Sequence, residues 1–251
     1  MSDARVASYA LSLGDDALVL GHRLSQWSSR APTLEEDIAL SNLALDLIGQ
    51  ARLFYTLAGE TEGNGRTEDD LAYFRDADAF RNVLMVELPN GDFAHTMVRQ
   101  LLYAAFAHPY LGALAGSPHR GLAEIAAKAV KEMAYHVRHS AEWVIRLGDG
   151  TDESRRRTIE ALQSLWPYAG ELFESDETEC TLIEAGMVPD RRRIQKPWDE
   201  TIDRALAEAG LERPVDSTAA HSGGRGGRHV HLAEMLADMQ SLARAHPGAT
   251  W

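Results

Sequence analysis

Four long stretches of this chain place apolar residues at the three- and four-residue spacing of an amphipathic helix. We expect long helices over about 5–27, 33–58, 92–114 and 120–147. The sequence TLEE at the start of the second stretch predicts a capping box, with Thr33 as the cap and Glu36 three residues later. Runs of alternating Val, Ile and Thr are absent from the sequence, so the pattern favours an all-α fold.

The links between these stretches indicate how the helices connect. The first and third links are short, which makes the flanking helices antiparallel neighbours, whereas the link between the two pairs has roughly 30 residues. Two helical hairpins joined by one long crossover are typical of a ferritin-like four-helix bundle. We therefore predict a single domain over 1–251, with a core bundle over about 5–148 and additional C-terminal helices over about 151–251.

Several local features refine this prediction. Gly14, Asp15 and Asp16 interrupt the apolar face of the first helix, and Gly148 is expected to end the fourth helix as a left-handed cap. A short helix is expected over 78–87. Further helices are expected over 152–175, 176–187, 197–209 and 229–246. The last of these has an apolar stripe that needs cover, made of Leu232, Met235, Leu236, Met239 and Leu242.

Composition limits the function classes. The formal charge of −13 argues against neutralising the phosphates of nucleic acid, and no apolar run is long enough to span a membrane. The N-terminal sequence lacks the apolar core and cleavage site of a signal peptide. The single cysteine, Cys180, cannot form an internal disulfide, which suits a reducing compartment. We expect a soluble, cytoplasmic protein.

The fourth helix contains half of a two-metal motif. Carboxylate-bridged di-iron bundles use Glu-x-x-His on each of two helices, with a glutamate from each of the other two. In KEMAYHVRHS, the residue three before His136 is Met133, and Glu132 is one position out of register. We favour the interpretation that Glu132 and His136 are buried side chains that satisfy each other's hydrogen bonds.

The second helix lacks the other half of the motif. In LALDLIGQAR, Asp46 is followed three residues later by Gly49, where a ligating imidazole is needed. A glycine inside a helix costs about 1 kcal/mol relative to alanine, so we expect a neighbouring helix to approach closely there. Asp15 and Asp16 are potential carboxylates on the first helix, but the third helix has no acidic residue after its start. We predict no catalytic, cofactor-binding or metal-binding residue in this chain.

Other motifs give weaker indications. Cys180 lies in the acidic run DETEC, which disfavours a thiolate nucleophile. The segment HSGGRGGRHVH lacks the lysine and the preceding strand of a phosphate loop, although its two arginines could meet an acyl-coenzyme A or an acidic partner. The arginines at 191–193 are expected in a solvated or partner-facing turn, and the HVH at 229–231 at the start of a surface helix.

Several blocks of the sequence resemble a known family. They include LALDLIGQAR, VELPNGDFA, IRLGDGT and HLAEMLADMQSLARAHPGATW, and together they run along nearly the whole chain. They are similar to the C subunits of bacterial phenylacetyl-coenzyme A ring 1,2-epoxidases, which belong to the multicomponent oxygenases of aerobic phenylacetate degradation. The resemblance implies a ferritin-like fold.

The resemblance also implies a role and partners. It implies a non-catalytic structural subunit that supports a catalytic A subunit, which holds the di-iron site, together with a small B subunit and a flavin and iron–sulfur reductase. That complex would convert phenylacetyl-coenzyme A, oxygen and NADPH to the ring epoxide. In fold-equivalent helices, Met133 and His136 take the places of one Glu and His pair, and Asp46 and Gly49 those of the other.

Two alternatives stay open at this point. The chain could bind iron itself, as a ferritin-like protein with an atypical site of Asp16, Asp46, Glu132 and His136, or it could be a helical scaffold without an oxygenase partner. If the chain is instead the non-catalytic subunit, we expect Asp16, Asp46, Glu132 and His136 to form a hydrogen-bonded core network. A subunit that normally buries an apolar face can also form homo-oligomers when it is isolated.

Overall fold

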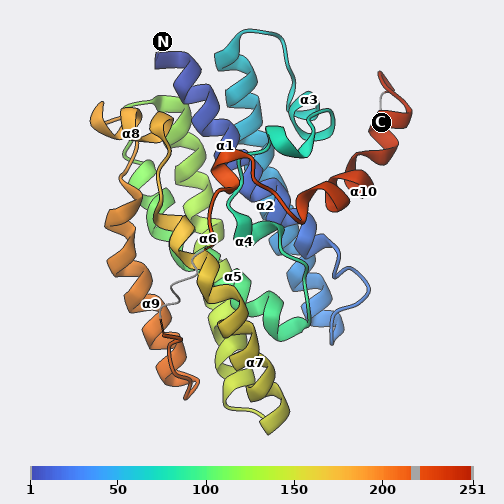
Figure 1. The fold of residues 1–251 in the computed structure, drawn as a ribbon, viewed down its shortest axis with the longest axis vertical. Coiled ribbons are helices and arrows are strands. Elements are labelled where there is room, and N and C mark those ends of the chain that lie inside the picture. Colours follow the sequence, from blue (N-terminus) through green and yellow to red (C-terminus); the bar gives the residue numbers. More distant parts are fainter. Residues whose placement is uncertain (1, 216–220, 250–251) are drawn as a thin grey trace. The chain divides into compact units, whose positions relative to one another are not determined.

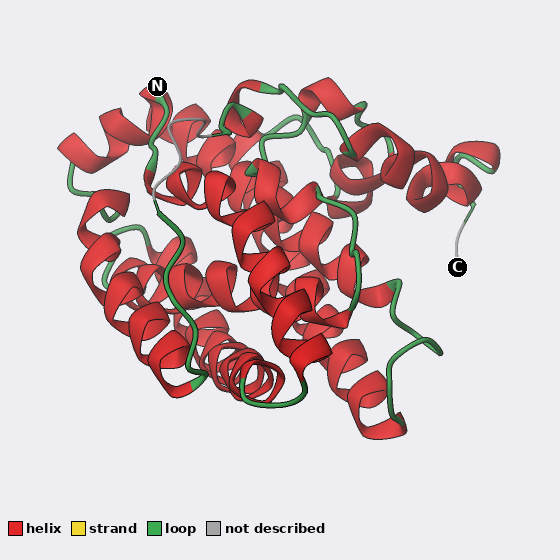
Figure 2. Cartoon of the chain, turned by 60° about the horizontal axis from the view of Figure 1, so that its bottom comes forward, coloured by secondary structure: helices red, strands yellow, loops and turns green. Residues whose placement is uncertain are grey.

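The computed structural model describes residues 2–215 and 221–249, and the described residues form helices and loops without strands (Figures 1 and 2). The predicted all-α fold class is confirmed, and the helices are consistent with a ferritin-like bundle that has additional C-terminal helices. The α-helices are α1 Ser2–Ser25, α2 Leu34–Glu62, α3 Glu68–Tyr73, α4 Leu84–Glu87, α5 Phe93–Leu114, α6 Arg120–Gly148, α7 Asp152–Leu165, α8 Glu177–Glu184, α9 Gln195–Glu208 and α10 Leu232–Ala245. The short 3-10 helices are η1 Ala77–Ala79, η2 Trp166–Phe173, η3 Arg191–Ile194 and η4 Gly224–Gly226.

The chain divides into two compact units. The first comprises Met1–Ser28, Ile38–Pro89 and Gly223–Trp251, and the second comprises Ser29–Asp37 and Asn90–Ser222. The C-terminal segment therefore belongs with the N-terminal helices rather than with the helices that precede it. That residues 1–251 form one domain stays a prediction.

Close helix contact in the first unit depends on glycines of α1. A Cβ on Gly21 would lie 3.2 Å from the carbonyl oxygen of Ala44 and 3.3 Å from the Leu47 Cβ. A Cβ on Gly14 would lie 2.5 Å from the ring of Tyr55. The predicted interruption of the apolar face at Gly14 is thus a point of close packing between α1 and α2, and the two aspartates beside it are buried.

The predicted short helix over 78–87 is wrong for its middle part. Only η1 and α4 are helical, and Phe80 and Val83 have extended backbones. The reason lies in α1, because the backbone N–H groups of Arg81 and Val83 donate to the carboxylates of Asp15 and Asp16, both at 2.8 Å. These two N–H groups are bonded to side chains of α1, so they do not make the backbone hydrogen bonds that would continue a helix.

The second unit is built around the antiparallel pair α5 and α6. Asp92 caps α5 by accepting from the backbone N–H of His95 at 2.9 Å. The Trp198 indole of α9 donates to the carbonyl of Leu102 at 2.9 Å, which attaches α9 to α5. Most of α5 is buried, consistent with its high proportion of alanine, leucine and aromatic side chains.

Two predicted helix ends differ in detail. Gly148 does not adopt a left-handed conformation but is the last residue of α6, and a Cβ there would lie 2.8 Å from that of Ala209. Its small size therefore serves packing against the end of α9. At the start of α2, the Glu36 N–H lies 3.4 Å from Thr33 Oγ1 as predicted, but the Glu36 carboxylate binds His139 Nε2 at 2.9 Å.

The C-terminal helices follow the prediction with shifted bounds. The stretch expected as one helix over 152–175 changes from α7 to η2 at Trp166, because Pro167 cannot donate a helical hydrogen bond. On α10, Leu232, Met235 and Leu236 are buried as expected, whereas Leu242 is 56% exposed. The predicted stripe is therefore only partly covered.

Candidate functional site

The residues expected at the half-motif of α6 are fully buried. Met133 and His136 both have no exposed surface, and they lie one helical turn apart. His136 Nδ1 lies 2.9 Å from Nε2 of Gln100, a residue of α5 that is itself fully buried. The imidazole therefore takes part in a hydrogen bond between α5 and α6.

The residues expected at the other half-motif lie on α2 and are partly exposed. Asp46 and Gly49 both retain some accessible surface. A Cβ on Gly49 would meet no atom of the described residues within 4 Å, so the expected close approach of a neighbouring helix within the chain is wrong. The helix-interior glycine has no packing reason among these residues.

These positions do not fit a pair of iron ions. Gly49 offers no side-chain ligand, and the Met133 thioether is a soft, weak donor where iron centres of this type use carboxylates. Among residues 2–215 and 221–249, no group of three or more His, Cys, Asp or Glu side chains is placed to hold a metal ion. Neither Gly49 nor Met133 offers the ligand that a Glu-x-x-His pair would need at its position.

The other two residues of the alternative iron site have partners of their own. Asp16 Oδ1 accepts the N–H of Val83, and Asp16 Oδ2 forms an ion pair with Arg225 at 2.6 Å. Glu132 lies 3.7 Å from the ammonium of Lys128 on the same helix. Asp16 and Asp46 belong to the first unit and Glu132 and His136 to the second, so the predicted network of all four stays a prediction.

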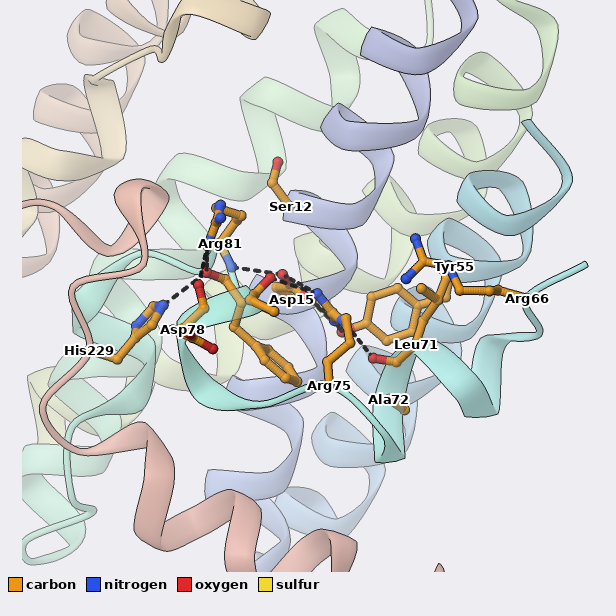
Figure 3. A network of polar contacts seen from close by, with 12 residues as sticks. Ser12, Asp15, Tyr55, Arg66, Leu71, Ala72, Arg75, Asp78, Arg81 and His229 are labelled. Atoms are coloured by element: carbon orange, nitrogen blue, oxygen red, sulfur yellow. Dashed lines mark hydrogen bonds and ion pairs between the residues drawn. The ribbon is translucent and has the colours of Figure 1, made fainter. Parts of the chain in front are cut away.

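The first unit holds a buried polar cluster that the sequence did not reveal (Figure 3). Asp15 accepts from the Tyr55 hydroxyl at 2.6 Å, forms a close ion pair with Arg75, and accepts the N–H of Arg81. The Arg75 guanidinium also lies over the ring of Phe80, 4.1 Å from its centroid. The sequence signal was the acidic pair inside an apolar helix face, which needs buried cationic partners from elsewhere in the chain.

The electrostatics of this cluster keep Tyr55 and Arg75 protonated. Burial, together with the neighbouring Asp15 carboxylate, raises the pKa of Tyr55 well above its usual value. Burial opposes the charge of Arg75, but Asp15 more than compensates, and the pKa of Arg75 is raised. Tyr55 therefore stays a hydrogen-bond donor and Arg75 a cation, which suits a structural role.

The glycine-rich segment is docked on the first unit instead of being open to a phosphate. Besides Asp16, the Arg225 guanidinium donates to the backbone carbonyls of Ser12 and Arg81, at 3.0 and 2.7 Å. A Cβ on Gly224 would lie 2.1 Å from the carbonyl oxygen of Asn82. The suggested role of Arg225 toward an acyl-coenzyme A or acidic partner is therefore wrong, because an internal carboxylate and two carbonyls already occupy this guanidinium.

A second contact of the same segment centres on Glu87. The carboxylate accepts from His229 Nδ1 at 2.7 Å and from the N–H groups of Val230 and His231 at 2.9 and 3.1 Å. Burial opposes ionisation of both groups, but their hydrogen bond lowers the pKa of Glu87 and raises that of His229. His229 precedes α10 and is buried, so its predicted place at the start of a surface helix is wrong.

In the second unit, the predicted solvated arginine turn is only partly solvated. Arg192 and Arg193 are exposed, but Arg191 is almost fully buried. Arg191 Nε donates to Glu179 Oε1 at 2.6 Å, and its guanidinium lies 4.8 Å from the centroid of the Tyr110 ring. Cys180, beside this carboxylate in the sequence, is exposed.

Comparison with known proteins gives a consistent result along the whole chain. Residues 1–251 match the family described as Phenylacetic acid catabolic protein. The chain is 44% identical over 248 residues to the C subunit of the 1,2-phenylacetyl-CoA epoxidase of Escherichia coli strain K12, covering 98% of this chain and 99% of that protein. Within the described residues, no helix is both long and apolar enough to cross a membrane. With a match over its full length and this degree of identity, the chain belongs to the phenylacetic acid catabolic protein family.

Proposed function

We propose that this chain is the non-catalytic structural subunit of a phenylacetyl-CoA 1,2-epoxidase and supports a di-iron catalytic A subunit in aerobic phenylacetate catabolism. The name of the E. coli relative supports membership of such a complex. Further partners in this proposal are a B subunit and a reductase, and the location is the cytoplasm. The di-iron centre belongs to the partner, and this chain supplies no cofactor ligand.

The observation that carries the proposal is Met133. It occupies the buried position from which a glutamate would have to ligate iron together with His136. A thioether there fills the interior with apolar volume, and His136 is used for a hydrogen bond to Gln100. Both changes exchange metal chemistry for packing and hydrogen bonding between α5 and α6.

Iron content tests the proposal directly. We expect the isolated chain to contain essentially no iron by elemental analysis, and its complex with the catalytic subunit to contain two irons per catalytic subunit. Co-purification of the two subunits is the second requirement. Stoichiometric iron in the isolated chain would overturn the proposal and favour the atypical site of Asp16, Asp46, Glu132 and His136.

Replacing His136 separates the structural role from a metal role. His136→Phe leaves the amide of Gln100 buried without this partner, so we expect lower stability, by about 1–3 kcal/mol. The iron content of the complex should stay unchanged. Loss of iron with unchanged stability would show that His136 is a ligand after all.

A further inference from the structure

Helices α3 and α10 of the first unit lie against each other (Figure 1), and a groove of about 520 Å³ opens beside their contact. Two large apolar side chains in it are unusually accessible, since Phe74 is 46% and Leu242 is 56% exposed. Exposed apolar side chains that gather in one groove indicate an interaction surface. We call it the α3–α10 groove and define it by Asp69, Asp70, Tyr73, Phe74, Met239 and Leu242.

Hydrogen bonds hold the two walls of the groove in place. The buried Gln240 amide of α10 donates to the backbone carbonyls of Ala72 and Arg75 at 3.0 and 2.9 Å. Arg244 donates to the carbonyls of Tyr73 and Arg75 at 3.1 and 2.9 Å. The groove is therefore formed in the folded chain, and a partner does not have to order it.

The groove is acidic. Asp69 and Asp70 line it, and no lysine or arginine of the described residues does. Within the described part of the chain, the Asp69 carboxylate has no hydrogen bond or ion pair. Hydrogen bonds from the backbone and side chain of Thr67 lower the pKa of Asp70, so this carboxylate stays ionised. The groove therefore offers negative charge to a cation from outside.

A second, smaller hollow adjoins the groove. Its volume is about 260 Å³, and Asp69 and Tyr73 line both depressions. The one basic side chain that lines the second hollow, among the described residues, is Arg52, and Glu68 balances its charge at a distance of 3.1 Å. Two adjoining depressions with a shared carboxylate suit a partner that presents several apolar side chains around a cation.

These features specify the chemistry of the partner. The walls of the groove are helices and offer no strand edge, so an extended segment would find no backbone to pair with, whereas a helix satisfies its own backbone. The exposed apolar side chains favour large apolar residues on that helix, and the carboxylates favour lysine or arginine. A second copy of this chain is disfavoured, because each copy carries a formal charge of −13.

We propose that the α3–α10 groove binds a basic amphipathic helix of another protein. The apolar side chains of that helix pack on Phe74, Met239 and Leu242, and a neighbouring lysine or arginine pairs with Asp69. A groove of this size buries less than the roughly 800 Å² per partner of a standard stable interface, so the contact is weak by itself. The partner is defined by this chemistry alone, and the proposal does not rest on the proposed function.

Binding of a synthetic peptide to the full-length chain tests the proposal. The probe is a fluorescein-labelled peptide of about 18 residues, built from leucine and lysine at the spacing of an amphipathic helix. Fluorescence anisotropy at about 0.15 M salt should give a dissociation constant of roughly 1–100 μM. A peptide with glutamate at every lysine position, and one with serine at every leucine position, should each bind at least about tenfold more weakly.

Matched variants separate the groove from the general negative charge of the chain. Leu242→Ser should weaken binding of the leucine–lysine peptide about tenfold, whereas Ile159→Ser, at another exposed aliphatic residue, should leave it unchanged. Asp69→Asn should weaken binding about twofold to fivefold. Glu142→Gln on α6 removes the same charge from another exposed position and should have no effect.

Reversal of the charge at Asp69 gives a readout that a defect in folding cannot imitate. Asp69→Lys should bind the leucine–glutamate peptide more tightly than the parent chain does, and the leucine–lysine peptide more weakly. An unchanged preference would contradict the role of this carboxylate.

Three further results would overturn the proposal. The leucine–lysine peptide could bind the parent and Leu242→Ser equally well, which would reduce the contact to general charge attraction. A chain that ends at Ala249 could bind at least about tenfold more tightly, which would assign the groove to residues 250–251. Sedimentation velocity could show self-association that Leu242→Ser abolishes, which would assign the groove to a second copy. None of these results depends on iron content or on the catalytic subunit, so failure of the groove and failure of the proposed function are distinguishable.

Discussion

Each unit contains a buried cluster in which a carboxylate contacts both an arginine and a tyrosine hydroxyl. In the first unit, the Asp15 carboxylate accepts a hydrogen bond from Tyr55 and forms an ion pair with Arg75. In the second unit, the Glu179 carboxylate accepts a hydrogen bond from the Tyr110 hydroxyl at 2.8 Å and forms an ion pair with Arg191 at 2.6 Å. Both arginines also lie over aromatic rings.

The two clusters differ in what else they hold. Arg75 donates to the backbone carbonyls of Leu71 and Ala79, and Asp15 accepts the N–H of Arg81, so the cluster satisfies an irregular backbone between α3 and α4. Arg191 donates to the backbone carbonyl of Leu172 at 3.3 Å. We therefore expect the Asp15–Arg75 pair to contribute more to stability than the Glu179–Arg191 pair, because it also satisfies backbone groups that no regular helix pairs.

Removing the cation of the first cluster should have the largest effect. We expect Arg75→Met to lower the free energy of unfolding by about 3–5 kcal/mol, because Asp15 stays buried without its ion-pair partner. Urea unfolding followed by circular dichroism measures this. Arg156→Met on α7 is the control, since Arg156 forms only exposed ion pairs, and it should change little. A cost below about 1 kcal/mol for Arg75→Met would contradict the backbone role.

The corresponding change in the second unit should cost less. We expect Arg191→Met to lower stability by about 2–3 kcal/mol, since the Glu179 carboxylate keeps the Tyr110 hydroxyl as a donor, and the carbonyls of the irregular segment that Arg75 holds are not involved. Hydrogen exchange should localise the loss to α8 and η3. If Arg191→Met costs more than Arg75→Met, the proposed ranking of the two clusters is wrong.

The docking of the C-terminal segment depends on the absence of a side chain at Gly224. We expect Gly224→Ala to cost about 1–3 kcal/mol, because its methyl group would collide with the Asn82 carbonyl. Gly226→Ala, two residues away, meets no atom of the described residues within 4 Å and should be nearly neutral. Limited proteolysis after Gly223 should increase in the first variant alone. Equal behaviour of the two variants would show that the segment is not held closely.

Two histidines should respond to pH in opposite ways, with the smallest effects on stability. The pKa of His229 is raised above 6.5, so its contribution is fully present below pH 6.5 and is lost as the pH rises through the raised value. Burial and the neighbouring Arg99 lower the pKa of His95 to about 4. Its contribution to stability is therefore present above pH 6.5 and is lost as the pH falls from 6.5 through about 4, because the unfolded chain binds the proton more readily. Proton NMR titration should give midpoints on opposite sides of 6.5. A shared midpoint would contradict both environments.

The sequence predicted regular structure well and long-range polar pairing poorly. Apolar spacing located the long helices, and the predicted cap Thr33 stands directly before the first residue of α2, Leu34. The missing ligands at Met133 and Gly49 were visible because a spacing rule could be applied to them. Asp15 and Arg75 are 60 residues apart, and no local pattern relates such partners.

The glycines show the same limit. Gly148 and Gly224 fit against neighbours distant in sequence, whereas Gly49 has none among the described residues. One residue type therefore carried two different meanings, which only the surroundings distinguish. The burial of Arg191 and His229 was not predicted for the same reason, since their partners Glu179 and Glu87 come from other segments of the chain.

The return of the C-terminal segment, from Gly223 onward, to the first unit has a consequence for how the chain acquires its structure during synthesis. Asp16 and Arg225 are 209 residues apart, so the carboxylate leaves the ribosome long before its guanidinium partner. The second unit can fold as its residues emerge, whereas the first must close a long-range contact after synthesis is complete. Nascent chains of this protein will thus carry an unfinished N-terminal unit, and premature termination before residue 223 removes the cationic partner of a buried acid.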